Sequence, residues 1–163
     1  MKMFLTTLAS PPFALTFWLR LAQIRGVWYW PAKIIHRHYF QKFGCQVFPS
    51  MKIGYGFCMQ HSICVVINPD TVIGNNVNVS QFTQIGTSKK HAAIIGDNVS
   101  LYPMVSLIND VHVGSNSTIG TGAVVTRDVP ENATVVGVPA KVLHYNNLGH
   151  FIGNRWPMPV FHE

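Results

Sequence analysis

Acidic side chains are scarce in this sequence. Six of the 163 residues are Asp or Glu, against twelve Lys or Arg, and charged residues make up 11% of the chain. The resulting net charge of +6 and pI near 9.5 predict anionic partners, such as a phosphorylated cofactor, a nucleotide sugar or a membrane surface. Nucleic acid is disfavoured, because outside residues 33–42 the basic residues form no dense run with interleaved aromatics.

A long hydrophobic run is missing as well. No stretch of 18 consecutive apolar residues occurs, which argues against a helix that spans a membrane. Lys2 followed by an apolar run resembles a secretory signal peptide, but Pro11 and Pro12 interrupt that run and Arg20 ends the next. We therefore expect a cytoplasmic protein, with the inner face of the membrane as a further interpretation.

Cysteine is rare and has no metal-binding spacing. Cys45, Cys58 and Cys64 are an odd number of thiols, which fits a reducing cytosol. We expect a structural role for these cysteines and no disulfide.

The sequence does contain a six-residue repeat of aliphatic residues. They stand at Ile67, Ile73, Val79, Ile85, Ile95, Leu101, Leu107, Val113, Ile119 and Val125. Glycine often follows the aliphatic residue, and Asn or Asp clusters just after the glycine, where a sharp turn needs unusual backbone dihedrals. A period of six fits neither a helix nor a plain alternating strand, so it indicates a short strand, a turn and the next strand.

Three such units close a triangular coil of about 18 residues, which stacks on the next coil at the strand spacing of about 4.8 Å. The repeat therefore predicts an all-β hexapeptide parallel β-helix. An antiparallel sandwich is the alternative, but its strands are spaced irregularly at about 8–12 residues.

The segment before the repeat is apolar, aromatic and basic. We divide the chain into an N-terminal helical segment (1–45), the β-helix (46–142) and a C-terminal tail (143–163). Residues 1–30 have two interpretations: a helical cap on the open end of the β-helix, or an interfacial helix that contacts anionic lipid. The hydrophobic content of 48% also favours a homo-oligomer.

Two interruptions of the repeat carry the candidate catalytic residues. Between Ile85 and Ile95 the step is ten residues rather than six, which predicts a protruding loop at 86–91 that ends in Lys90 and His91. A second irregularity lies at residues 59–64 and contains His61. An isolated histidine is usually a surface or packing residue, but a position beside a repeat defect and near a basic loop favours a functional role.

The segments 54–61 and 65–74 resemble the hexapeptide acyltransferases of the serine acetyltransferase type. So do residues 120–125 and the run from Asp128-Val129-Pro130 to Val136-Gly137-Val138-Pro139-Ala140-Lys141. The resemblance spans roughly residues 46–142, and it implies left-handed coiling and a homotrimer.

The resemblance also implies transfer of an acetyl group from acetyl-CoA to a hydroxyl, without a metal. His61 would be the general base, because a neutral imidazole can accept the hydroxyl proton near neutral pH. A backbone N–H would stabilise the oxyanion. The pantetheine arm of the coenzyme would lie near Pro103, Gly120 and Thr121, and its phosphates near Lys141.

Three features depart from the serine-specific members. Their Asp, fifteen residues before the catalytic His, is replaced by Gln46, which offers only a neutral amide to His61. His91 lies four residues before Ile95 rather than three, so its active-site role is an open expectation. Only some 45 residues precede the β-helix, where serine acetyltransferases have a large helical domain.

Short relatives of this build resemble the acetyltransferases of surface-polysaccharide synthesis, and the tail at 151–156 is similar to theirs. This resemblance favours a sugar hydroxyl as acceptor, with serine as the alternative. Remote alternatives are a non-enzymatic scaffold and a carbonic-anhydrase-like zinc protein with His61, His91 and His112, although these histidines lack the spacing of that zinc site.

Overall fold

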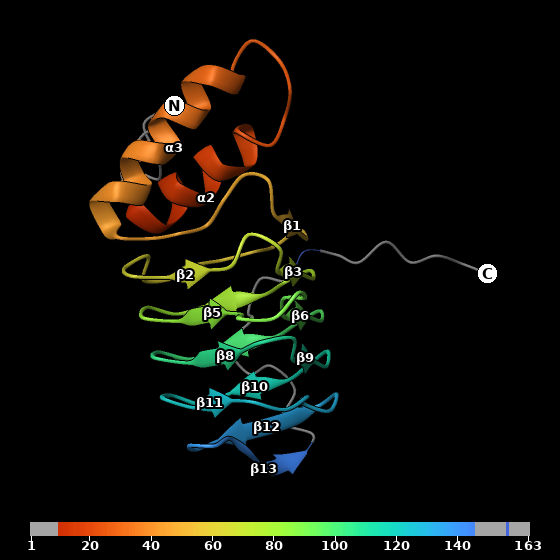
Figure 1. The fold of residues 1–163 in the computed structure, drawn as a ribbon. Helices are drawn as coiled ribbons and strands as arrows, with labels where there is room; N and C mark the ends of the chain where they lie inside the picture. Colours follow the sequence, from red (N-terminus) through yellow and green to blue (C-terminus); the bar gives the residue numbers. More distant parts are fainter. Residues whose placement is uncertain (1–9, 146–155, 157–163) are drawn as a thin grey trace, which may run out of the picture.

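The computed structural model describes residues 10–145 and Trp156. Two helices, α2 (Pro11–Leu21) and α3 (Tyr29–Phe43), precede a stack of short strands (Figure 1). The strands are β1 (Lys52–Ile53), β2 (Val66–Ile67), β3 (Val72–Ile73), β4 (Asn78–Val79), β5 (Gln84–Gly86), β6 (Ile94–Ile95), β7 (Ser100–Leu101), β8 (Ser106–Ile108), β9 (His112–Val113), β10 (Thr118–Ile119), β11 (Val124–Val125), β12 (Ala133–Val136) and β13 (Lys141–Tyr145).

The strands form three sheets, one for each side of a triangular coil. We name them the β1 sheet (β1-β3-β6-β9), the β2 sheet (β11-β8-β5-β2) and the β4 sheet (β13-β12-β10-β7-β4). Strands from successive coils pair in parallel, as β2 does with β5 and β5 with β8. The chain thus forms a β-solenoid of about five turns, which confirms the predicted left-handed parallel β-helix.

The aliphatic residues of the repeat form the core. All ten residues of the six-residue series are buried, from Ile67 to Val125. Each lies above or below its equivalents in neighbouring coils, as Ile67, Ile85 and Leu107 do in the β2 sheet. The predicted columns of inward-facing side chains are confirmed.

One corner of the triangle is lined by a ladder of asparagines. Asn76, Asn98, Asn116 and Asn132 all have positive φ, between 54° and 61°, a conformation that Asn tolerates better than most residues. The Nδ2 atom of each of the first three donates to Oδ1 of the next, over 3.0–3.2 Å. The side chains therefore continue the coil-to-coil hydrogen bonding where the strands end.

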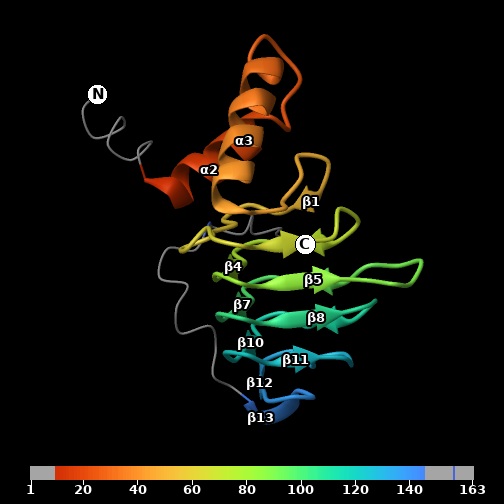
Figure 2. The ribbon, with the colours of Figure 1, turned by 60° about the vertical axis from the view of Figure 1, so that its left-hand side comes forward.

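The predicted loop at 86–91 is confirmed, and it leaves the strand register intact. Paired residues in successive coils are normally 18 apart, as Ile94 and His112 are, but Val72 pairs with Ile94, 22 residues away. The four extra residues project from the coil directly after β5 (Figure 2).

The helices cover the first coil. Leu15 and Leu19 of α2 are fully buried within the same hydrophobic core as the coil residues. Arg20 donates through Nη1 to the carbonyl of Ile53 over 2.7 Å and through Nη2 to the carbonyl of Gly54. These contacts support the cap interpretation for the part of residues 1–30 that the structure describes.

At the opposite end β13 pairs antiparallel with β12, whereas the coils pair in parallel. Among the described helices, none is long and apolar enough to cross a bilayer. Cys45, Cys58 and Cys64 are free thiols.

Candidate active site

His61 lies at a corner that several side-chain contacts hold in place. The corner runs from Cys58 to Val66. Cys58 forms a parallel β-bridge with Asn78 of the β4 sheet, and Val66 belongs to the β2 sheet. Ser62 is buried and its Oγ donates to the carbonyl of Met59 over 3.0 Å. The carbonyl of Ser62 accepts from the buried thiol of Cys45, which fills the structural role expected of it. The corner is thereby fixed while the His61 side chain points to solvent.

The residues predicted to hold the coenzyme lie along the same edge of the prism. Equivalent corners of successive coils are linked by backbone bonds: Phe82 N to Ile63 O, Met104 N to Gln81 O, and Gly122 N to Pro103 O. We call this column of corners, 59–65, 81–83, 103–105 and 121–123, the His61 edge. Pro103 and Thr121 belong to it, and Gly120 directly precedes its last corner.

Lys141 lies at the far end of the His61 edge. The turn before it is bound to β11 through Ala140 N and Val124 O, and Lys141 pairs with Val136. Four coil steps at about 4.8 Å separate His61 from this turn, which is roughly 19 Å. The edge therefore offers an elongated ligand a continuous path between a histidine and a cation.

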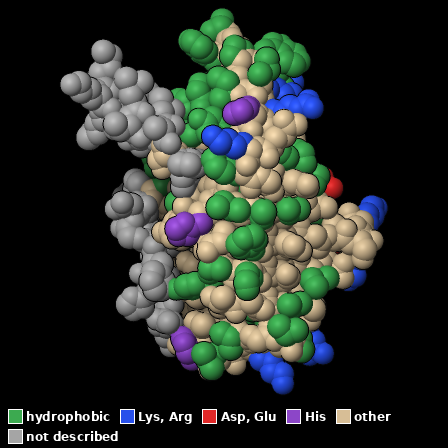
Figure 3. Space-filling model, turned by 90° about the vertical axis from the view of Figure 1, so that its left-hand side faces the viewer, with side chains coloured by type: hydrophobic (Ala, Val, Ile, Leu, Met, Phe, Trp, Pro, Cys, Tyr) green, Lys and Arg blue, Asp and Glu red, His purple; other side chains and the backbone are tan. Residues whose placement is uncertain are grey.

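Apolar side chains are exposed along the His61 edge. Ile63, Phe82 and Met104, one from each of three successive coils, are about half exposed. Figure 3 shows hydrophobic side chains gathered over the coils on the left-hand face of Figure 1, with few charges among them. A row of exposed apolar groups in register is typical of a surface that another protein surface covers.

His91 lies at a different corner, between the β2 sheet and the β1 sheet. The loop 86–91 is held by Thr87, whose Oγ1 donates to the carbonyl of His91 over 2.9 Å. An ion pair of 2.8 Å between Lys89 and Asp110 ties the loop to the next coil. The hydrogen bond from Lys89 lowers the pKa of Asp110.

Beside this loop is a cavity of about 720 Å³ with both signs of charge on its walls. Its polar residues are Asp70, Lys90, His91, Asp110 and His112, and its apolar ones are Val72, Ala92 and Ile94. Reasoning from the sequence missed Asp70 and Asp110. Asp70 and Asp110 each lie two residues before equivalent strand positions, Val72 and His112, but this equivalence becomes visible only when the four inserted residues are counted.

Comparison with known proteins agrees with this architecture. Residues 92–127 match the family described as bacterial transferase hexapeptide (six repeats). The serine acetyltransferase of Bacillus licheniformis is 37% identical over 108 residues, which are 63% of this chain and 50% of that protein. The serine acetyltransferase of Bacillus subtilis is 33% identical over 137 residues, 72% of this chain and 63% of that protein.

The fold of the chain is also that of a solved serine acetyltransferase. The Neisseria gonorrhoeae enzyme, determined in complex with serine, superimposes with a TM-score of 0.70 and 30% identity over 82% of this chain and 57% of that one. The chain is a serine acetyltransferase-like hexapeptide-repeat protein. It spans between 30% and 63% of the length of the curated relatives it matches.

In this serine acetyltransferase-like chain, six of the seven predicted site residues fall into two groups. His61, Pro103, Gly120, Thr121 and Lys141 share the His61 edge, whereas His91 belongs to the other corner. Gln46 lies one coil position above Val66, bound through its backbone to Val65 and Ile67, and its side chain is exposed. One copy of the chain thus does not bring His61 and His91 together.

No group of three or more His, Cys, Asp or Glu side chains in the described part of the chain is placed to hold a metal ion. Residues 151–155 of the tail, which carried the resemblance to the polysaccharide enzymes, lie outside the described residues.

Proposed function

We propose that this protein transfers the acetyl group of acetyl-CoA to a hydroxyl, and that L-serine is the acceptor. The observation that carries the proposal is the shared edge of His61, Pro103, Gly120, Thr121 and Lys141, in a chain that is 37% identical to a serine acetyltransferase over 108 residues. The comparisons favour this serine alternative over the sugar acceptor expected from the sequence, since the relatives named above are serine acetyltransferases and one was solved with serine.

In the proposed reaction His61 takes the proton of the acceptor hydroxyl. The hydroxyl oxygen attacks the thioester carbonyl, and a backbone N–H stabilises the negative charge on the carbonyl oxygen. The new C–O bond forms, the C–S bond breaks, and the proton passes from His61 to the departing thiolate. A general base of this kind contributes about 10²–10⁴-fold to the rate.

The coenzyme would lie along the His61 edge with its phosphates at Lys141. A thioester at the His61 end and a phosphate at the Lys141 end would then be separated by roughly 19 Å of edge. The positive net charge of the protein would assist capture of this polyanion.

The complete site would form between copies of the chain in a homotrimer. His61 and His91 lie on different edges of the prism, so a rotation axis can bring the His61 edge of one copy against the His91 cavity of the next. The exposed Ile63, Phe82 and Met104 would be covered by the same contact.

The His91 cavity suits a zwitterionic acceptor. Lys90 and His91 can meet a carboxylate, while Asp70 can meet an ammonium group. A neutral sugar would use neither charge. One observation supports the sugar as a second candidate: Gln46 stands where the serine-specific enzymes have an Asp.

The test is acetyl-CoA consumption with L-serine, compared with nucleotide sugars and simple glycosides, for the wild type and His61→Ala. We expect turnover with serine and a loss of about 10²–10⁴-fold in kcat for the variant. His38→Ala, which changes an exposed histidine outside the site, is the control and should keep full activity. Turnover of a sugar without turnover of serine would show that the acceptor is a sugar and not L-serine. A fully active His61→Ala variant would show that His61 is not the general base.

A further inference from the structure

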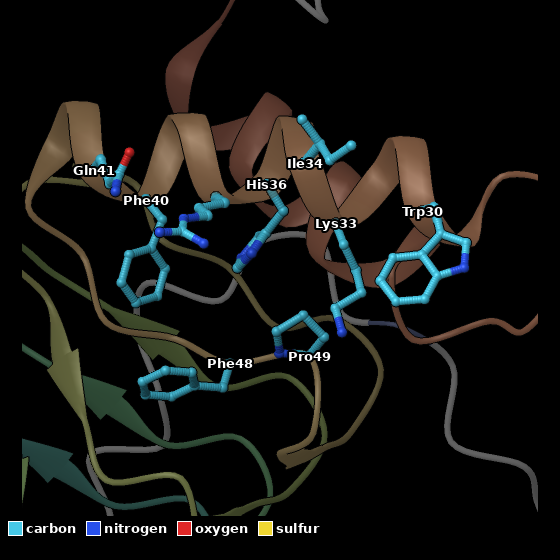
Figure 4. Close-up of a pocket in the computed structure, with 9 residues that line it drawn as sticks. Trp30, Lys33, Ile34, His36, Phe40, Gln41, Phe48 and Pro49 are labelled. Atoms are coloured by element: carbon cyan, nitrogen blue, oxygen red, sulfur yellow. The ribbon is translucent and has the colours of Figure 1, made fainter.

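A second cavity, of about 570 Å³, lies between helix α3 and the loop at Phe48 and Pro49 (Figure 4). Its wall is aromatic: the rings of His36 and Phe40 are 5.7 Å apart edge to face, and Phe40 and Phe48 are 5.4 Å apart. The predominantly apolar wall favours a ligand with an apolar portion.

His36 gives this cavity an unpaired polar group. The residue is only 3% exposed, and its Nε2 atom is buried without a hydrogen-bond partner in the described part of the chain. Figure 4 shows the ring projecting from α3 toward Pro49. Burial lowers the pKa of His36, so the ring is neutral at physiological pH. A buried polar atom without a partner is costly, and a ligand oxygen or hydroxyl would satisfy it.

Cations stand at the mouth of the cavity. Lys33 and Arg37 line it, and the Nζ atom of Lys33 lies 5.0 Å from the ring centre of Tyr29 and 5.3 Å from that of Trp30. These contacts hold the ammonium group beside the indole.

No acid in the sequence precedes Asp70. Residues 1–69 carry seven Lys or Arg and no acid, which is +7, while residues 70–163 carry five Lys or Arg and six acids, which is −1; together they give the +6 of the chain. The positive charge of the protein is thus concentrated in the segment that contains α3. Charge of one sign at this density attracts an extended anionic surface.

The same segment exposes large apolar side chains. Ile24, Val27, Trp28, Trp30 and Ile34 are each more than 60% exposed, although they lie within eleven residues of one another. Exposed tryptophans beside Lys and Arg are typical of helices that lie in the interface of a bilayer. A second copy is a poorer occupant, because it would bring the same positive charge.

We propose that α3 and the preceding turn dock onto a membrane that contains anionic phospholipid. Lys33 and Arg37 bind a lipid phosphate at the mouth of the cavity, and His36 binds an oxygen of the same lipid. Trp28, Trp30 and Ile34 enter the interface. This inference does not depend on acyl transfer, and its test needs no substrate.

The experiment is co-sedimentation of the full chain with vesicles of phosphatidylcholine, with and without phosphatidylglycerol. We expect binding only to the anionic vesicles, with weaker binding at higher salt. Each basic residue near the surface contributes a factor of about 5, so Lys33→Gln/Arg37→Gln should bind about 25-fold more weakly. His36→Phe, which keeps an aromatic ring and removes both ring nitrogens, should bind about five-fold more weakly.

The matched control is Lys52→Gln/Arg127→Gln, which removes two exposed charges elsewhere and should stay within a factor of two of the wild type. Equal losses in both double variants would show that net charge alone attracts the protein, and would overturn the proposal. Equal binding to neutral vesicles, or no binding to either kind, would overturn it too. Self-association without lipid that Trp30→Ala abolishes would assign the surface to a second copy instead.

Discussion

The side-chain amide of Asn76 holds the backbone of Trp156, eighty residues further along the chain. Its Oδ1 accepts from the Trp156 N–H over 2.7 Å, and its Nδ2 donates to the Trp156 carbonyl over 3.2 Å. The Trp156 indole also stacks on Tyr55 with ring centres 5.5 Å apart. The first rung of the asparagine ladder therefore also anchors residue 156 to the first two coils.

Asn76→Gly should release Trp156 without straining the corner, since glycine accepts the positive φ of residue 76. We expect amide exchange at Trp156 to become faster by about five-fold or more, the effect of losing about 1 kcal/mol of hydrogen bonding. Asn116→Gly is the control, because it breaks the ladder without touching Trp156. An unchanged exchange rate in Asn76→Gly would contradict the anchoring.

Arg20→Met should destabilise the junction between α2 and the first coil. The variant keeps an apolar stem but leaves the carbonyls of Ile53 and Gly54 without their donor. We expect the free energy of unfolding in urea to fall by about 2 kcal/mol. Arg127→Met, at an exposed arginine in the last coils, should change it by less than about 0.5 kcal/mol. Similar effects of the two changes would deny Arg20 its capping role.

Gly74→Ala should disrupt the stacking of the coils. A Cβ atom at residue 74 would lie 2.6 Å from Oδ1 of Asp97 and 2.7 Å from the backbone of Gly96, too close for either group. We expect a loss of about 1–3 kcal/mol in thermal or urea unfolding. Gly26→Ala is the matched control, because nothing lies within 4 Å of the place its methyl group would take, and it should be neutral or slightly stabilising. Tolerance of both changes would contradict the close stacking.

A shared active site predicts complementation between inactive variants. His61→Ala and His91→Ala should each be inactive alone, but mixed trimers formed from both should recover activity. With random assembly of equal amounts, about a quarter of the sites receive His61 from one intact edge and His91 from another. Activity of co-expressed and separately expressed variants measures this fraction. Absence of recovery in verified mixed trimers would place both histidines outside a shared site.

The buried His36 should make stability depend on pH. Burial lowers its pKa in the folded state, so the unfolded chain binds an extra proton as the pH falls below about 6.5. The free energy of unfolding is therefore highest above that pH, where His36 is neutral in both states, and it declines as the pH falls toward the folded-state pKa. The stability of wild type relative to His36→Phe should therefore fall between pH 7.5 and 5.5 in urea unfolding. A difference independent of pH would contradict this titration.

The sequence predicted the regular parts of the fold because each coil repeats the same local requirement. Ile67, Ile85 and Leu107 occupy one column, since a period of six allows only one inward position per side. The two interruptions were visible for the same reason: His61 and the loop 86–91 break a rhythm that the rest of the chain keeps.

Contacts that do not recur from coil to coil could not be predicted from the sequence. Arg20 reaches Ile53 and Asn76 reaches Trp156 through side-chain geometry that no spacing encodes. The positions of His61 and His91 on different edges could be assigned only from the structure. Their separation of thirty residues in the sequence does not say which corner each occupies. Asp70 and Asp110 can be placed beside His91 only when the four inserted residues are included in the spacing between successive coils.

The antiparallel pairing of β13 has a consequence for growth of the molecule. The last coil of a parallel β-helix exposes unpaired backbone N–H and C=O groups like those on which each coil stacks. Nothing in the repeat itself therefore prevents a second molecule from pairing there and growing into a fibre. β13 runs against that direction on the β4 sheet, and α2 covers the first coil. The two ends thus block the addition of further coils, and they prevent the molecules from stacking end to end into a fibre.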